Sequence, residues 1–408
     1  MLKFFIILLV LLGEGYSVFL KIVRYRSAGN PTPANVADIY DAETYRKWKA
    51  YSAEHCKTDI IFGAISFVIT FVLLLTNAYA AFASLFPADE ISRMVGVLVL
   101  AAIVDTVLDI PKSYIKTMVI EEKYGFNRST KKTFVADTIR ATVFSVLLTF
   151  ALAFLMRNLH LLVGDYLILC FAGAMFLISF FVTFTYPWFS RIGNKFTPLE
   201  DGELRERLMA MLTKHGYRIK AIEVMDASRR TTKLNAYFAG MGKLKRVVLY
   251  DNMLNAMSTD EICAVFAHEM GHGLHKDILK RQILNIVYML VMGVSVWAVV
   301  SVPSLCTAFG FDGLNYGFAF LLVGIGLSIV QPLMSLLINY SSRAAEYRAD
   351  AQTVSEGYGE AMISALKKLA KDNFAHLAPS KISVALEYSH PPVSERIAAV
   401  ERAVKKNA

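Results

Sequence analysis

The chain has 408 residues, of which 55% are hydrophobic and 19% are charged. This composition excludes an ordinary soluble enzyme and is typical of a polytopic membrane protein, so a lipid bilayer is an expected partner. Basic loops on one side of a membrane explain the formal net charge of +9 better than nucleic-acid binding does, and no nucleic-acid partner is expected. The four cysteines have no paired spacing, which argues against a disulfide framework and against a cysteine metal site.

Apolar stretches long enough to cross a bilayer, which takes about 20 residues, are predicted at seven places. The loops between them alternate in charge. The first, third and fifth loops and the tail are rich in lysine and arginine, whereas the opposite loops contain only Arg93 and Arg157. The positive-inside rule therefore places the fifth loop and the tail in the cytosol. The predicted spans are residues 2–20, 60–86, 91–115, 134–156, 167–189, 283–302 and 316–338.

The third predicted span carries two aspartates, Asp105 and Asp109, four residues apart on one face of a helix. One interpretation is a polar stripe that lines a cavity inside the membrane region. The other is a buried network in which the pair contacts Lys112 or Lys116. The sequence favours neither interpretation, and we expect residues 116–133 to form a polar loop after this span.

The predicted spans divide the chain into four regions. These are residues 1–189 with five spans, a cytosolic insertion at 190–280, two further spans at 281–340, and a cytosolic C-terminal region at 341–408. The insertion has α+β character, because a stretch with helical spacing is followed by stretches that alternate as strands do. Gly240 and Gly242 separate the last two strands, as a hairpin requires. The predicted strands are residues 221–225, 235–239 and 246–250.

The insertion ends with the motif HEMGH at residues 268–272. On a helix, His268 and His272 project from the same face and can bind one divalent metal ion, with Glu269 beside a metal-bound water. Ser258 and Glu261 form a predicted capping box at the start of this helix. We expect zinc to lower the pKa of the water and Glu269 to take its proton and pass it to the leaving amine. The alternative is a solvated helix with incidental histidines.

A zinc site of this type needs a third protein ligand. Glu346 and Asp350 follow the last span and share one helical face. Glu346 can bind the metal while Asp350 accepts the free ring N–H of a ligating histidine and fixes its tautomer. The alternative is a surface helix with arginine–glutamate pairs. The ligand interpretation is favoured because the HEMGH motif otherwise lacks a third ligand.

An oxyanion formed during hydrolysis needs a hydrogen-bond donor besides the metal. His390 is the best candidate, because the two prolines that follow it restrict the backbone, although a lone histidine is more often structural. We interpret His215, His275 and His376 as surface residues.

Together these features resemble the type I CAAX prenyl proteases, which are integral-membrane zinc endoproteases. The resemblance covers most of the chain and implies a mainly α fold, with seven transmembrane helices around a large water-filled chamber and a small α+β insertion that carries the zinc helix. The matching motifs are IEEKYGFN at 120–127, KFTPL at 195–199, NAYF at 235–238, HEMGH at 268–272, EYRAD at 346–350 and HPP at 390–392.

The resemblance also implies the activity and its residues. A single zinc ion held by the two histidines and Glu346 would serve cleavage after a prenylated cysteine, which removes the last three residues of a CAAX protein. Asn235 would hold the extended substrate backbone beside an edge strand. His390 would assist the transition state, and Arg396 would support Glu346. The implied partners are prenylated CAAX substrates, and we expect a monomer.

The last four residues, KKNA, match a dilysine signal for retrieval to the endoplasmic reticulum, although an ordinary basic tail is the alternative. We expect a multi-pass protein of that membrane, or of the inner membrane in a bacterium, with the active site and C-terminus facing the cytosol. The sequons at Asn127 and Asn339 would then carry no glycan.

Two other functions fit parts of the sequence. One is a membrane quality-control metalloprotease that resembles the bacterial heat-shock type, a family that usually has fewer spans. The other is a non-enzymatic transporter or metal-binding membrane protein that uses Asp105 and Asp109.

Overall fold

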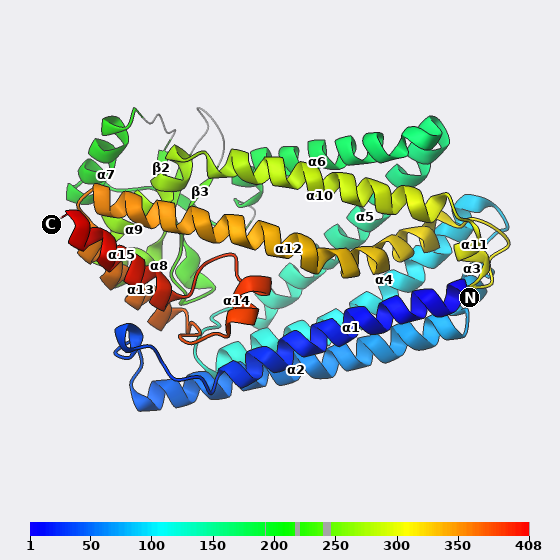
Figure 1. Ribbon diagram of the computed structural model, residues 1–408, viewed down its shortest axis with the longest axis horizontal. Coiled ribbons are helices and arrows are strands. Elements are labelled where there is room, and N and C mark those ends of the chain that lie inside the picture. The colour runs from blue at the N-terminus through cyan, green and yellow to red at the C-terminus, as the bar shows by residue number, and fades with distance from the viewer. Residues whose placement is uncertain (192, 217–220, 240–245, 408) are drawn as a thin grey trace.

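The computed structural model describes residues 1–191, 193–216, 221–239 and 246–407. Long helices run side by side along an elongated molecule, and the sheet and several shorter helices gather at one end, where the chain also ends (Figure 1). The N-terminus lies at the opposite end, beside α3 (Ala78–Ala83) and α11 (Ser304–Thr307). The predicted turn glycines Gly240 and Gly242 lie outside the described residues.

The helices confirm a polytopic membrane protein. Among the described residues, six helical stretches are long and apolar enough to cross a membrane. The fourth stretch contains two helices, α5 (Lys131–Val163) and α6 (Leu167–Phe189), which a short turn at Gly164 with φ 51° separates. The count of seven spans therefore stays a prediction. The six stretches are Leu2–Ser27 (α1), Ala42–Leu75 (α2), Glu90–Glu121, Lys131–Thr183, Asp277–Val300 (α10) and Tyr316–Ser355 (α12).

The third stretch is longer than the sequence predicts. Helix α4 (Glu90–Tyr114) continues as a π-helical turn, Ile115–Glu121, so the predicted loop is wrong over residues 116–121. The reason is an ion-pair cluster: Nζ of Lys112 and of Lys116 lie 3.6 and 2.7 Å from Oδ1 of Asp59 on α2. Lys112 was predicted at the end of the span and Lys116 at the start of a loop, but α2 supplies the partner of both.

Cavities lie between the membrane helices. Asp105 lines three of them, of about 1000, 610 and 240 Å³, and Asp109 lines two. The cavity interpretation of this aspartate pair is therefore correct, since Lys112 and Lys116 pair with Asp59 instead. The largest of these three cavities is also lined by Glu387, and the next residue, Tyr388, lines the cavity of the site described below.

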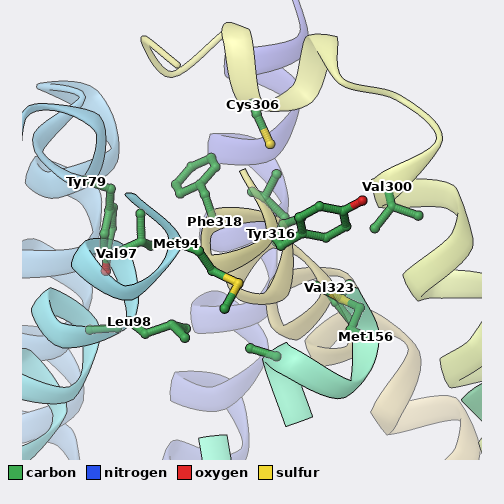
Figure 2. Close-up of a cluster of buried hydrophobic side chains, with 14 of the residues drawn as sticks. Tyr79, Met94, Val97, Leu98, Met156, Val300, Cys306, Tyr316, Phe318 and Val323 are labelled. Carbon is green, nitrogen blue, oxygen red and sulfur yellow. The ribbon is translucent and has the colours of Figure 1, made fainter. Parts of the chain in front are cut away.

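An apolar cluster joins the helices at the N-terminal end. Figure 2 shows Phe318 and Tyr316 of α12 among side chains from α3, α4 and α11. The ring nitrogen Nδ1 of His160 lies 2.8 Å from the Tyr316 hydroxyl, which ties α5 to the same cluster. The labelled residues of the cluster are Tyr79, Met94, Val97, Leu98, Met156, Val300, Cys306, Tyr316, Phe318 and Val323.

The sheet has four strands in the order β1-β2-β4-β3. The parallel pair β2–β4 forms its centre, and β1 and β3 add antiparallel edges. The three predicted strands are confirmed. The three-residue β1 was not predicted as a strand because it is too short to alternate. The strands are β1 (Phe196–Pro198), β2 (Ala221–Met225), β3 (Ala236–Ala239) and β4 (Arg246–Tyr250).

Helices pack around this sheet and complete the site end of the molecule. Helix α9 lies among α7, α10, α12 and α13, and nearly all its residues from Glu261 to Gly271 are buried. Short 3-10 turns at Ala34–Val36, Gly164–Tyr166 and Ala227–Arg229 complete the order of elements. The remaining helices are α7 (Glu203–Lys214), α8 (Asp251–Ala256), α9 (Thr259–Leu274), α13 (Gly359–Asp372), α14 (Lys381–Glu387) and α15 (Val393–Asn407).

Candidate metal and active site

Helix α9 begins where the sequence predicts. Ser258 Oγ accepts from the Glu261 backbone N–H at 3.3 Å, and the Glu261 carboxylate accepts from the Ser258 N–H at 2.7 Å. This capping box satisfies donors that a helix start leaves open. It fixes the register of α9, and therefore the face on which His268 and His272 project.

A glycine inside the HEMGH motif lets α9 approach α12. A Cβ atom at Gly271 would lie 3.0 Å from Cα of Ala349 and 3.1 Å from Cβ of Gln352, closer than ordinary contacts. Only glycine allows this approach without a shift of one helix. The close packing brings the two histidines of α9 next to Glu346 of α12.

His268, His272 and Glu346 form a compact group of metal-binding atoms. Their ligand atoms all lie within 4.8 Å of one another, and no other such group occurs in the described part of the chain. Nε2 of His268 lies 3.4 Å from Oε2 of Glu346, and Nε2 of His272 lies 3.3 Å from Oε1. The buried Oε2 has no hydrogen-bond partner among the described residues. Two imidazoles and a carboxylate with an unsatisfied oxygen fit a zinc ion.

Carboxylates contact both histidines at Nδ1, the ring nitrogen that faces away from the metal group. Nδ1 of His268 lies 2.9 Å from Oδ1 of Asp350, and Nδ1 of His272 lies 3.1 Å from Oδ2 of Asp277. A proton on each Nδ1 leaves Nε2 free to bind a metal. Asp277 was missed from the sequence, although an acid five residues after the second histidine is the kind of signal that could have revealed it. Arg348 holds Asp277 at 2.7 Å.

Arg396 of α15 closes the group. Its guanidinium donates to both oxygens of Asp350, at 2.6 and 2.9 Å, and its Nη1 lies 3.3 Å from Oε2 of Glu346. Nη2 also lies 3.3 Å from Nδ1 of His268, farther than Asp350 does. We therefore assign the Nδ1 proton to the bond with Asp350.

Burial shapes the titration of the site. It raises the pKa of the Glu269 carboxyl, which suits a group that must accept a proton near neutral pH. Burial and Arg396 oppose a charged imidazole at His268. Hydrogen bonds to Asp350 and Glu346 outweigh them and raise the pKa of His268 to about 9. A metal ion that binds Nε2 of His268 must therefore displace a proton from the imidazole.

One cavity of about 590 Å³ brings the predicted residues together. It is lined by His268, Glu269, His272, Glu346, Asn235, His390 and Arg396, so Asp350, behind His268, is the one predicted site residue that does not line it. His390 presents its Nδ1 to Oε1 of Glu346 at 2.9 Å, with two-thirds of its side chain exposed. The arrangement can hold a divalent metal beside a buried carboxylate base, which is the chemistry of metal-assisted hydrolysis.

Comparison with known families agrees with this geometry. Residues 198–404 match the model described as "Peptidase family M48". The chain belongs to this family. Residues 3–191 match "CAAX prenyl protease N-terminal, five membrane helices". The M48 match makes the chain a metalloprotease, so the interpretation as a non-enzymatic transporter is wrong.

Individual relatives extend over nearly the whole chain. "CAAX prenyl protease 1 homolog" of Oryza sativa is 31% identical, and the alignment covers 96% of this chain and 95% of that protein. "CAAX prenyl protease 1" of Saccharomyces cerevisiae is 27% identical, with coverages of 92% and 89%. The crystal structure of S. mikatae Ste24p has a TM-score of 0.91 at 25% identity, with coverages of 98% and 99%. The predicted resemblance to the CAAX prenyl proteases is confirmed.

A further residue that lines the site cavity, Asn373, was missed from the sequence. Its side-chain Oδ1 accepts from the Leu234 N–H at 2.9 Å, and its Nδ2 donates to the Leu234 carbonyl at 3.2 Å. The backbone just before Asn235 is therefore clamped from the end of α13. Asn235 itself is exposed to the cavity, at the start of edge strand β3. No spacing rule connects residues 234 and 373, so only the fold reveals this contact.

Two histidines that were predicted as surface residues are half-buried and have side-chain partners. His215 sits 2.6 Å from Glu356, the residue that follows α12. The ring of His376 packs against Trp48 at a tilt of 59°, with ring centroids 4.7 Å apart, and its Nε2 lies 2.8 Å from Oγ of Ser27. The interpretation was wrong because their partners come from distant helices.

The environment of His376 predicts a loss of stability in mild acid. Burial, and to a lesser extent Arg24, lower its pKa to about 4, and its Nδ1 accepts the Ala378 N–H. The unfolded chain, with an ordinary pKa near 6.5, binds a proton that the folded chain refuses between these values. The free energy of unfolding therefore decreases by up to about 3 kcal/mol as the pH falls from 7 towards 4. Thermal unfolding from pH 7 to 4.5 should show a smaller decrease for His376→Gln than for the wild type; equal decreases would contradict this.

Replacing Asp350 by asparagine should weaken zinc binding by about 10- to 100-fold, since the ring of His268 loses its carboxylate partner. Chelator competition on the purified protein measures this affinity. Glu356→Gln is a matched control, because it removes a carboxylate–histidine contact just beyond the same helix, away from the metal group. An unchanged zinc affinity in folded Asp350→Asn protein would show that Asp350 does not support the site.

Proposed function

We propose that the chain is a zinc endoprotease of the membrane that removes the C-terminal tripeptide from prenylated CAAX proteins. The observation that carries the proposal is the group of His268, His272 and Glu346 beside the buried Glu269, in a cavity next to the cavities of the membrane helices. The names of the full-length relatives supply the substrate class. Together they favour this function over membrane quality control.

His268, His272 and Glu346 would hold the single zinc ion. When bound, zinc supplies a Lewis acid that lowers the pKa of water and polarises a carbonyl. Asp350 and Asp277 keep the two imidazoles in the tautomer that leaves Nε2 free. Arg396 compensates the charge of Asp350 and holds it in place.

The remaining residues act on substrate and protons. Glu269 takes a proton from the attacking water and passes it to the leaving amine. Asn235, at the start of an edge strand, holds an extended substrate backbone as an added strand. His390, exposed in the same cavity, donates a hydrogen bond to the oxygen of the attacked carbonyl.

Loop charges and the KKNA tail support a place in the endoplasmic reticulum membrane, with the site facing the cytosol. The site end of the molecule lies opposite its N-terminus, α3 and α11, in agreement with the charge alternation (Figure 1). A glycan on Asn127 would contradict this orientation.

The function is tested with the purified full-length chain and a farnesylated CAAX peptide. Cleavage should stop when a zinc chelator is added and return when zinc is restored in excess. Cleavage that persists in the chelator, after the metal has been shown to be removed, would contradict the zinc mechanism.

A further inference from the structure

The site cavity contains a second arginine that the mechanism does not use. Two arginines line it, Arg281 and Arg396. Arg396 is buried and bound to Asp350 and Glu346. Arg281 is exposed and makes no hydrogen bond or ion pair with any described residue. A guanidinium that lines the cavity without a protein partner is available to bind an anion.

The position of Arg281 comes from the turn between α9 and α10. Lys276, with φ 55°, separates the two helices, and Arg281 follows in the first turns of α10, nine residues after His272. The nearest acid in sequence, Asp277, is already held by Arg348 and His272. Arg281 lies at the border between the metal site and the membrane helices, and no acid among the described residues pairs with it. Contact with lipid headgroups is the alternative for such a residue.

The other charged groups of the site compensate one another, so Arg281 is the group that can pair with an incoming anion. Arg396 compensates Asp350, and a bound metal would be balanced by Glu346 and Glu269. A substrate that ends three residues after its scissile bond brings a free α-carboxylate into this cavity. Three extended residues span about 10 Å, and Arg281 lines the same cavity of about 590 Å³ as His268, His272 and Glu346. A guanidinium can bind a carboxylate through two parallel hydrogen bonds.

We propose that Arg281 binds the C-terminal carboxylate of the substrate and so makes the enzyme select bonds three residues from a free chain end. This inference rests on the proposed function and deepens it. It assigns substrate specificity to a side chain outside the zinc motif and its supporting residues.

The test compares two farnesylated peptides that differ only at the end, one with a free carboxylate and one with a primary amide. Wild type should cleave the acid with a kcat/KM at least about tenfold above that for the amide. Arg281→Gln should lose most of this preference, because its kcat/KM falls for the acid and stays unchanged for the amide. Arg281→Lys should restore part of the preference. Lys280→Gln is the matched control, because Lys280 is the neighbouring cation and does not line the site cavity. Its one ion pair, 3.7 Å from Asp277, is longer than the 2.7 Å contact by which Arg348 holds the same carboxylate.

Each outcome decides between the inference and its alternatives. An Arg281→Gln enzyme with the wild-type preference overturns the inference, as does an equal loss on both peptides, which would mean a structural role. A loss of preference in Lys280→Gln as large as in Arg281→Gln would indicate general surface charge. Failure of wild type to cleave either peptide would instead overturn the proposed function. Zinc content and thermal unfolding of each variant establish that the site is intact.

Discussion

Replacing Glu269 by glutamine will abolish hydrolysis and leave the metal in place. The carboxylate lines the cavity beside His268 and His272 but is not part of the metal-binding group. Glutamine has nearly the same shape and cannot accept a proton, so general-base catalysis worth about 10²- to 10⁴-fold is lost. Peptide cleavage and zinc content are measured on the same purified sample.

His268→Ala serves as the contrast to Glu269→Gln, since it removes a nitrogen of the metal group itself. It should lose zinc and activity together. A Glu269→Gln protein that retains a tenth or more of wild-type kcat would show that another group accepts the proton. A Glu269→Gln protein that loses its zinc would place Glu269 among the ligands.

Replacing Glu346 by alanine will remove both zinc and activity. This carboxylate is the one member of the metal group contributed by α12, and it also contacts Arg396 and His390. Loss of a supporting carboxylate weakens zinc binding about 10- to 100-fold, so loss of the ligand itself should exceed that range. Zinc per chain after dialysis and peptide cleavage are the two measurements.

Glu395→Gln is the matched control for Glu346→Ala. Glu395 lies on α15, one residue before Arg396, and accepts a hydrogen bond from Tyr347 instead of facing the metal group. Its replacement should leave zinc content and cleavage at wild-type values. Full zinc content in Glu346→Ala protein would contradict the assignment of the third ligand.

The sequence predicts this site well where local rules apply. A capping box sets the start of α9, and four-residue spacing puts His268 and His272 on one face. The same spacing rule placed Glu346 and Asp350 on one helical face. Because the HEMGH motif of α9 needs a third ligand, Glu346 could be assigned to the same metal site. The structure brings these residues within hydrogen-bond or metal-binding distance of one another.

Contacts between distant segments could not be predicted. Asn373 holds the backbone of Leu234 across 139 positions, and His376 packs on Trp48 from the first loop. Lys116 looked like a loop residue because its partner, Asp59, lies on another helix. The sequence around a charged or polar side chain does not indicate which distant segment will provide its hydrogen-bond or ion-pair partner. For that reason these surroundings were not predicted, whereas apolar runs and alternation did predict a polytopic membrane protein and the strands β2, β3 and β4.

The most direct test of the account is the mass of the products that full-length protein releases from a farnesylated CAAX peptide. We expect cleavage of a single bond, after the farnesylated cysteine, with the intact C-terminal tripeptide as the second product. Glu269→Gln protein, at equal zinc content, should release neither product. Cleavage at several other bonds, or equal cleavage of the same peptide without its farnesyl group, would contradict the account.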